Sequence, residues 1–378
     1  MQPGDPAARH VDVVVIGAGQ AGLSSAYHLH RQGFASHHEF VVLDRSDGPG
    51  GAWRHRWPSL RLDDVHGIHD LPGLAFGGKD ETRPAADVVA EYFGDYEKAF
   101  DLPVLRPAGV TAVRRGNGDR LLVASSAGSW SARAVINATG TWTHPFRPHC
   151  PGQESFTGRQ LHTADYRDAE EFRGHHVIVV GGGISAVELL SEISRVATTT
   201  WATRRPPVFT GTEFTSEDGR AAVATVERQV RAGLPPGSIV GLTGLPSTPA
   251  IRRAHERGVL ERSPMFDRIT PTGVAWNDGT EVAADAILWA TGFRPAIDHL
   301  APLGLREPGG GIRLDGTQAV AEPRLHLVGY GPSASTVGAN RAGRSAACAV
   351  TAAVRGFSRP GGEPGHQRRS RTRPSDAA

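Results

Sequence analysis

Two glycine-rich segments in this chain have the residue types and the spacing of dinucleotide-binding loops. The first is Gly17-x-Gly19-x-x-Gly22, which also contains Gln20 and Ala21. In such a loop one glycine permits a tight turn, the next lets the backbone approach a pyrophosphate, and the third lets a helix pack closely on a strand. The phosphates would lie on the N-terminus of the following helix, where backbone amides favour an anion.

An acidic residue stands where the first loop needs a partner for a ribose. Asp44 ends the apolar run 40–44 and lies 22 residues after Gly22, and Arg45 follows it. A carboxylate at the end of the second strand of such a unit can hydrogen-bond an adenosine ribose. We therefore predict that the first loop binds FAD.

The second loop differs from the first in its third position. It reads Gly181-x-Gly183-x-x-Ala186, with Ile184 and Ser185 inside it. An alanine at the third position still allows close packing of helix and strand. We expect a second dinucleotide here.

Basic residues take the place of the acid after this second loop. Thr203, Arg204 and Arg205 follow the next strand. An acid would repel a 2′-phosphate, whereas an arginine can donate charge-assisted hydrogen bonds to it, so the pattern favours NADPH. The alternative is that both arginines are ordinary solvated side chains. A chain that holds two dinucleotides side by side suits hydride transfer between them, which predicts a flavin reduced by a nicotinamide.

Strand and helix patterns surround both loops and predict an α/β fold with two Rossmann-like domains, the NADPH domain being inserted into the FAD domain. Asn277-Asp278-Gly279 is a strong hairpin turn. The expected strands are 11–16, 40–44, 134–138, 177–180, 200–203, 273–276, 282–290 and 325–329, the expected helices are 21–33, 84–100, 183–196 and 336–355, and 211–262 is expected to be mostly helical.

The predicted domains follow from these elements. Residues 1–10 are expected to form a flexible leader, and 11–168 with 285–357 a discontinuous FAD-binding domain. Residues 169–284 are expected to form the NADPH-binding domain. The segment 358–378 is rich in Pro, Gly and Arg and has few apolar residues, so disorder is expected there.

Composition excludes several classes of protein. With 41 basic and 39 acidic side chains, the net charge of +2 is too small to indicate nucleic-acid binding. Cys150 and Cys348 are the only cysteines, which argues against a disulfide framework, a zinc site or a CxxC redox pair. The chain has neither a signal-peptide pattern nor an apolar run long enough to span a bilayer. We expect a cytoplasmic protein with no metal site and no membrane or nucleic-acid partner.

A third motif lies just before the second loop and carries a family likeness. It reads Phe156-x-Gly158-x-x-x-His162-x-x-x-Tyr166, and it resembles the identifying sequence of the class B flavin-dependent monooxygenases, in particular the bacterial flavin-containing monooxygenase-like proteins. The likeness extends over about 12–356. Related Baeyer-Villiger enzymes usually have Trp at the position of Tyr166, which favours oxygenation of a heteroatom here and leaves ketones open.

The resemblance implies further cofactor contacts. The loop after the ribose acid and the last flavin-binding element would contact FAD, and two Ala-Thr-Gly segments would be the crossings between the domains. The implied FAD contacts are Gly51, Trp53, Leu60, Leu62, Ala138, Thr139, Gly140, Gly329, Ser335 and Thr336, and the implied NADPH contacts are Ala290, Thr291 and Gly292.

No catalytic residue is identified by its pattern. Asn340, near the start of the last helix, and His162 are weak candidates, and a packing role for Asn340 or a core role for His162 is an equal alternative. Relatives often place an Asn beside the flavin after the loop 50–62, the tryptophan loop, which contains Trp53, but 62–74 contains none. This departure bears on the oxygenating step and leaves flavin binding unaffected.

The mechanism that the resemblance implies starts with hydride transfer from NADPH to FAD. The reduced flavin would react with O2 to give a C4a-hydroperoxide, which would insert one oxygen atom into a small-molecule N, S or ketone substrate. Two other functions stay open: an NADPH-dependent reductase or oxidase without oxygen insertion, and a non-catalytic nucleotide-binding redox sensor.

Overall fold

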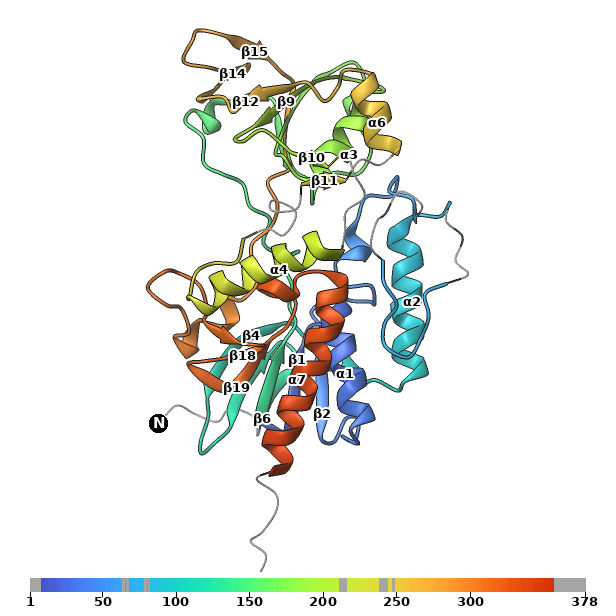
Figure 1. Ribbon diagram of the computed structural model, residues 1–378, viewed down its shortest axis with the longest axis vertical. Coiled ribbons are helices and arrows are strands. Elements are labelled where there is room, and N and C mark those ends of the chain that lie inside the picture. Colours follow the sequence, from blue (N-terminus) through green and yellow to red (C-terminus); the bar gives the residue numbers. More distant parts are fainter. Residues whose placement is uncertain are drawn as a thin grey trace, which may run out of the picture.

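The computed structural model describes residues 8–62, 65, 68–77, 80, 82–210, 216–237, 244–246 and 249–356. These residues form two α/β units, one above the other in Figure 1, each built on its own sheet. The predicted fold class is therefore confirmed. The tail 358–378 lies outside the described residues.

The larger sheet has nine strands and contains the first glycine loop. Its central path is β17-β18-β19-β6-β1-β2-β3, and the antiparallel pair β4 and β5 extends it from β6. β2 and residues 13–16 of β1 are apolar and buried, as parallel strands covered on both faces should be. Its strands are β1 (Arg9–Ile16), β2 (Phe40–Leu43), β3 (Val104–Leu105), β4 (Val110–Arg115), β5 (Leu121–Ser125), β6 (Gly128–Asn137), β17 (Leu314–Asp315), β18 (Gln318–Ala319) and β19 (Glu322–Leu327).

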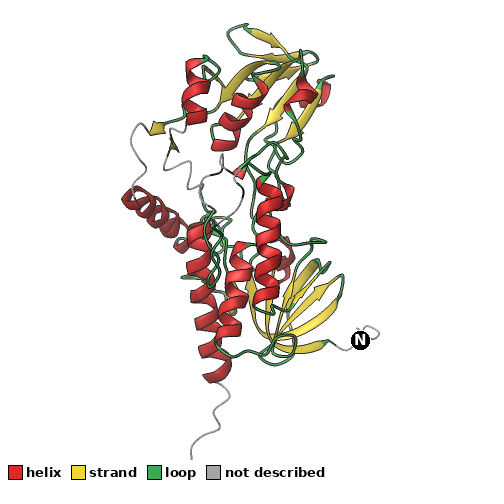
Figure 2. Cartoon of the chain, turned by 90° about the vertical axis from the view of Figure 1, so that its right-hand side faces the viewer, coloured by secondary structure: helices red, strands yellow, loops and turns green. Residues whose placement is uncertain are grey.

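Helices cover this sheet and present their apolar faces to it. α1 and α7 lie side by side in both views, and their small residues allow close approach (Figures 1 and 2). α2 buries Val88, Val89, Tyr92, Phe93 and Tyr96, at the helical spacing that the sequence predicts. The helical elements are α1 (Gln20–Arg31), α2 (Ala85–Ala99), α7 (Thr336–Gly356) and the 3-10 turns η1 (Trp53–His55), η5 (Asp298–Leu303) and η6 (Gly331–Ser333).

The second sheet has five parallel strands in the order β12-β9-β8-β16-β7 and contains the second glycine loop. α3 and α6 pack with it, and β13, β14 and β15 form a separate antiparallel sheet. The elements of the second unit are β7 (Arg159–His162), β8 (His176–Val180), α3 (Ile184–Ile193), β9 (Thr198–Thr203), β10 (Phe209–Thr210), β11 (Leu245–Pro246), α6 (Pro249–Glu256), β12 (Arg262–Pro264), β13 (Arg268–Thr270), β14 (Gly273–Ala275), β15 (Glu281–Ala283), β16 (Ala286–Trp289), and the 3-10 turns η3 (Gln153–Ser155) and η4 (Ala169–Phe172).

Two expected elements differ from the observed ones. The strand expected at 282–290 is two strands in different sheets, because β15 pairs with β14 whereas β16 lies between β8 and β7. Arg9 and His10, expected in the leader, begin β1 and pair with Trp130 and Ser131 of β6. The guanidinium of Arg9 lies over the Trp130 ring, which accounts for the early start.

Four elements lie in the other unit from the one that the expected domain ranges give them. β7 is the edge strand of the second sheet, β16 lies beside it in the same sheet, and η3 comes just before β7. α4 (Ser216–Arg231) comes after β10, but Val226 and Val230 are buried in the core of the first unit. With these exceptions, we propose 11–168 with 285–357 as the FAD-binding domain and 169–284 as the NADPH-binding domain.

Candidate functional site

The first glycine loop has the geometry of a phosphate cradle. Gly17 has φ +97°, and a Cβ there would lie 2.6 Å from the Ala138 carbonyl oxygen, so only glycine fits. A Cβ at Gly22 would collide with the Gly17 carbonyl, so this position must also be glycine. A Cβ at Gly19 would meet no protein atom within 4 Å, so the space beside this backbone is open. Gln20 and Ala21 begin α1 directly behind it.

The second loop repeats this geometry. Gly181 has φ +141°, and a Cβ there would collide with the Ala290 carbonyl oxygen. The space beside Gly183 is open in the same way, and Ala186 is fully buried. Ile184 and Ser185 begin α3 behind the loop. The space beside the backbone is thus open at both loops, and a dinucleotide pyrophosphate would fit there.

Asp44 lies at the end of β2, where a ribose partner is expected. Its side chain is buried, and one oxygen accepts a hydrogen bond of 3.0 Å from the Ser46 amide. The other oxygen lies 3.2 Å from Arg106, which also forms a bidentate ion pair with Glu97. The neighbouring Arg45 is exposed. The carboxylate is held in one orientation before any ligand binds.

The basic pair after β9 lies on an exposed turn with a fixed base. Arg204 and Arg205 are exposed. Thr203 is buried, donates to the Arg205 carbonyl at 2.8 Å, and accepts from Arg262 at 2.7 Å. Both guanidinium groups are therefore at a strand end where an adenosine ribose is expected.

The tryptophan loop connects the two units. A Cβ at Gly51 would lie 2.9 Å from the Gly19 Cα, so the loop passes over the first cradle. Trp53 packs against the cores of both units, and Leu60 and Leu62 belong to the buried cluster that includes the α3 side chains. Ser59 of this loop donates a hydrogen bond of 2.6 Å to Glu192 of α3.

Tyr166 of the third motif meets the same carboxylate. Its hydroxyl donates to Glu192 Oε1 at 2.9 Å, so one oxygen accepts from both Tyr166 and Ser59. Burial raises the pKa of Tyr166, and the charge of Glu192 raises it further, so the phenol remains a donor. Sequence reasoning missed Ser59 and Glu192, because no local pattern reveals a contact between residues so far apart in the chain.

His162 of the same motif fastens the second Ala-Thr-Gly turn. It is fully buried, and its Nδ1 accepts from the Ala164 amide at 3.1 Å. Nε2 must then carry the hydrogen, which it donates to the Gly292 carbonyl at 2.9 Å. Burial lowers the pKa of His162, so the ring is neutral. Gly158 is required because a Cβ would lie 2.5 Å from the Asp285 carbonyl oxygen.

Each Ala-Thr-Gly turn is hydrogen-bonded to the chain segment that follows the other turn. Thr139 donates to the Ala296 carbonyl at 2.6 Å, and Gly140 accepts from the Ala296 amide at 2.9 Å. Thr291 donates to the Phe146 carbonyl, and the Phe146 amide donates to the Gly292 carbonyl at 2.9 Å. The crossings therefore form one joint between the cradles.

Aromatic rings reinforce this joint. Trp142, just after the first turn, stacks on Phe293, just after the second, with ring centroids 5.0 Å apart. His162 meets the same Phe293 edge to face at 4.9 Å. The ring stack brings the segments that follow both turns into direct contact.

The last expected flavin element begins at Gly329, which has φ +68°. η6 and the exposed Ser335 follow it, and Thr336 begins α7. Asn340 in the next turn accepts from Gln20 at 3.0 Å and donates to the Asp70 carbonyl at 2.8 Å. An asparagine therefore reaches the first cradle from α7, although the segment 62–74 contains none.

Comparisons with known proteins agree with this arrangement. A model of the family described as pyridine nucleotide-disulphide oxidoreductase matches residues 14–218, which is more than half of the chain. The structure of a flavin-containing monooxygenase from Stenotrophomonas maltophilia is 41% identical, covers 91% of this chain and 99% of its own, and superposes with a TM-score of 0.78. The chain belongs to this family and, within it, to the flavin-dependent monooxygenases.

Two other proteins are less similar to this monooxygenase. An uncharacterized CzcO-like oxidoreductase of Geobacillus kaustophilus is 26% identical over 289 residues, or 75% of this chain and 80% of the relative. The open structure of cyclohexanone monooxygenase shares the fold at 17% identity, with a TM-score of 0.62 over 93% of this chain and 88% of the other. The predicted family is confirmed, and the chain is a flavoprotein oxidoreductase, which excludes the non-catalytic sensor.

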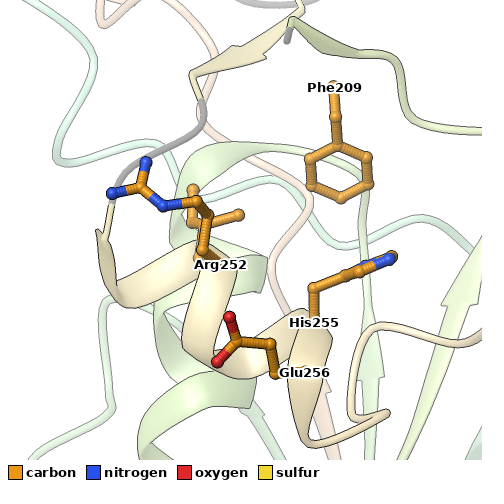
Figure 3. A pocket seen from close by; sticks show the side chains of 5 residues that line it. Phe209, Arg252, His255 and Glu256 are labelled. Atoms are coloured by element: carbon orange, nitrogen blue, oxygen red, sulfur yellow. The ribbon is translucent and has the colours of Figure 1, made fainter.

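A cavity of the monooxygenase lies between β10 and α6. It has a volume of ≈ 260 Å³, and Phe209 from β10 and His255 from α6 face each other across it (Figure 3). Ile251, Arg252 and Glu256 complete its lining. All five residues belong to the second unit, whereas a pocket over the flavin would need both units.

In the described part of the chain, no helix combines the length and the apolar character needed to cross a membrane. Within the same residues, His, Cys, Asp and Glu do not gather in threes that could hold a metal ion.

Proposed function

We propose that this monooxygenase is reduced by NADPH and transfers one oxygen atom from O2 to an N, S or ketone group of a small molecule. FAD bound in the first cradle would supply the redox chemistry: it would take a hydride from NADPH and activate O2, so that one oxygen atom enters the substrate and the other leaves as water. The observation that carries the proposal is the joint between the cradles: the Trp142 and Phe293 rings stack at 5.0 Å, so the segments after both turns adjoin.

In this proposal the first cradle holds FAD. The amides at Gly19, Gln20 and Ala21 would bind the pyrophosphate, and Asp44 would accept from the ribose. Gly51, Trp53 and the turn Ala138-Thr139-Gly140 would contact the cofactor along its length. The remaining proposed FAD contacts are Gly17, Gly22, Arg45, Leu60, Leu62, Gly329, Ser335 and Thr336.

The second cradle holds NADPH in this proposal. The exposed pair Arg204 and Arg205 supports a 2′-phosphate over a bare ribose hydroxyl. His162 fixes the Gly292 carbonyl and so positions the turn beside the nicotinamide half. The proposed contacts here are Gly181, Gly183, Ile184, Ser185, Ala186, Ala290, Thr291 and Gly292.

Asn340 is proposed as a positioning residue next to the flavin. Its amide is already engaged by Gln20 and the Asp70 carbonyl, so it holds α7, α1 and the segment 68–70 together. An Asn340→Ala variant should retain FAD and yet release a larger share of its electrons as hydrogen peroxide, because a loosened pocket admits water.

The proposed function is tested by following oxygen. The holoenzyme would be supplied with NADPH and 18O2 in the presence of a panel of thioethers, amines and ketones, and products would be analysed by mass spectrometry. One 18O atom in a product, with NADPH consumed in proportion, is the expected result. If all electrons from NADPH are recovered as peroxide for every compound, the chain is an oxidase and the proposal fails.

A further inference from the structure

One charged side chain at the joint between the units stands out by its surroundings. Arg56 follows η1 in the tryptophan loop, and its Cζ lies 5.7 Å from the centre of the Trp53 ring and 5.2 Å from that of Trp142. His55, its neighbour, stacks on the same Trp142 at 5.8 Å. The guanidinium is therefore held by indole faces, which attract a cation but accept few of its hydrogen bonds.

One N–H group of this guanidinium has no hydrogen-bond acceptor. Arg56 Nε is buried, and in the described part of the chain it is the one buried side-chain nitrogen or oxygen without a hydrogen-bond partner. A buried donor left unpaired costs about 1 to 3 kcal/mol, and more on a charged group. Burial lowers the pKa of Arg56, while Glu188 of α3 opposes that shift by its charge. An arginine in this setting has donor capacity that only an additional acceptor can use.

The place of Arg56 restricts what that acceptor can be. Trp53 comes two residues after Gly51, which lies against the first cradle, and Trp142 stacks on Phe293 next to the second. Glu188 lies in the second turn of the helix that the second cradle begins. Arg56 thus lies where the redox-active ends of both cofactors and the substrate would meet.

We propose that Arg56 is an oxyanion receptor at this joint, which binds the carboxylate of an anionic substrate or a phosphate of the nicotinamide dinucleotide. The planar fork of arginine matches both groups with two parallel hydrogen bonds, whereas the indole rings keep it in place and exclude water. The inference rests on the proposed function, since it assumes that a nicotinamide dinucleotide and a substrate bind at this joint.

The test measures binding to the oxidised holoenzyme, which requires no oxygen transfer. Wild type, Arg56→Met and Arg56→Lys would be titrated with NADP+, with phenylacetate and with its neutral analogue phenylacetamide, by calorimetry and flavin difference spectra. Arg195→Met, which removes an exposed guanidinium from the same chain, is the matched control.

In Arg56→Met, the affinity for one of the two anions should fall about ten- to a hundred-fold, as expected for the loss of a hydrogen bond between charged groups. A loss confined to phenylacetate assigns a substrate carboxylate, and a loss confined to NADP+ assigns a cofactor phosphate. Arg56→Lys should fall between, because it keeps the charge without the fork. If NADP+ and phenylacetate both bind Arg56→Met within twofold of wild type, the inference is overturned.

Two controls separate this result from other failures. FAD content and Tm report whether Arg56→Met folds, and if it does not, Arg56→Lys carries the comparison. A loss of phenylacetamide binding equal to that of phenylacetate would indicate a packing role for Arg56 and contradict the inference. If the enzyme proves to be an oxidase, the binding result stands and only the proposed function fails.

Discussion

The carboxylate of Glu192 offers the sharpest prediction about how the two units are held together. One of its oxygens accepts from Tyr166 at 2.9 Å and from Ser59 at 2.6 Å, so it connects the third motif, α3 and the tryptophan loop. In a Tyr166→Phe variant the ring stays in place, since Tyr166 is 1% exposed and packs edge to face on Trp57. The change therefore removes one hydrogen bond and little else.

The expected loss of unfolding free energy in Tyr166→Phe follows from the charge and the partial exposure of the acceptor, Glu192. A hydrogen bond to a charged group contributes about 1.5 to 3 kcal/mol. Because Glu192 is half-buried, we expect a loss of about 1 to 2 kcal/mol. For domains of this size that is a fall in Tm of about 2 to 8 °C.

Calorimetry of the holoenzyme would measure this fall and test its cause. Ser59→Ala should cost a similar amount, and the double variant should differ from the sum of the single variants by at least about 0.5 kcal/mol, because both donors share one oxygen. Tyr166→Trp, which keeps an N–H donor, is the matched comparison. A Tyr166→Phe protein that melts within 1 °C of wild type, or strictly additive variants, would refute the reasoning.

Three further predictions concern the cradles and one buried histidine. Gly183→Ala should keep FAD and the fold, since its Cβ meets no protein atom within 4 Å, but should weaken NADP+ binding measured by calorimetry. Gly22→Ala should instead yield protein without FAD, because its Cβ would collide with the Gly17 carbonyl. Replacing Arg204 and Arg205 by Ala should reduce the preference for NADPH over NADH about ten- to a hundred-fold in the rate of flavin reduction, and an unchanged preference would show that neither arginine meets the 2′-phosphate. His326 is 2% exposed, and burial lowers its pKa to about 4. The unfolded chain takes up a proton at this histidine first, so stability is lost as pH falls below about 6.5, by about 2 kcal/mol at pH 5. His326→Asn should remove that part of the acid sensitivity in denaturant titrations at pH 7 and 5. An identical loss of stability in both proteins would contradict the role given to His326.

Sequence patterns predict the parts of this molecule whose causes are local. The tight turns at Gly17 and Gly181 require glycine for reasons confined to a few residues, and α2 follows its apolar spacing. The α/β class and the insertion of one Rossmann-like unit in the other could be predicted in the same way.

Contacts between distant segments could not be predicted, because no spacing encodes them. The hydrogen bond from Ser59 to Glu192 joins residues 133 positions apart. The split of 282–290 into β15 and β16 depends on which sheet each half joins, and the apolar pattern of the segment does not contain that choice. No sequence pattern distinguishes the role of Arg56, because its surroundings, and not its residue type, set it apart.

The position of α4 has a consequence for protein engineering. The chain leaves the second unit after β10, buries Val226 and Val230 against Gly331 and Tyr330, and is back in the second unit at β11 (Figure 1). A chimera that exchanges the stretch between the two Ala-Thr-Gly turns with that of a relative would therefore carry α4 onto a foreign partner surface. Donor and acceptor must be matched at Gly331 as well as at the two splice points, or the hybrid will expose Val226 and Val230 of α4.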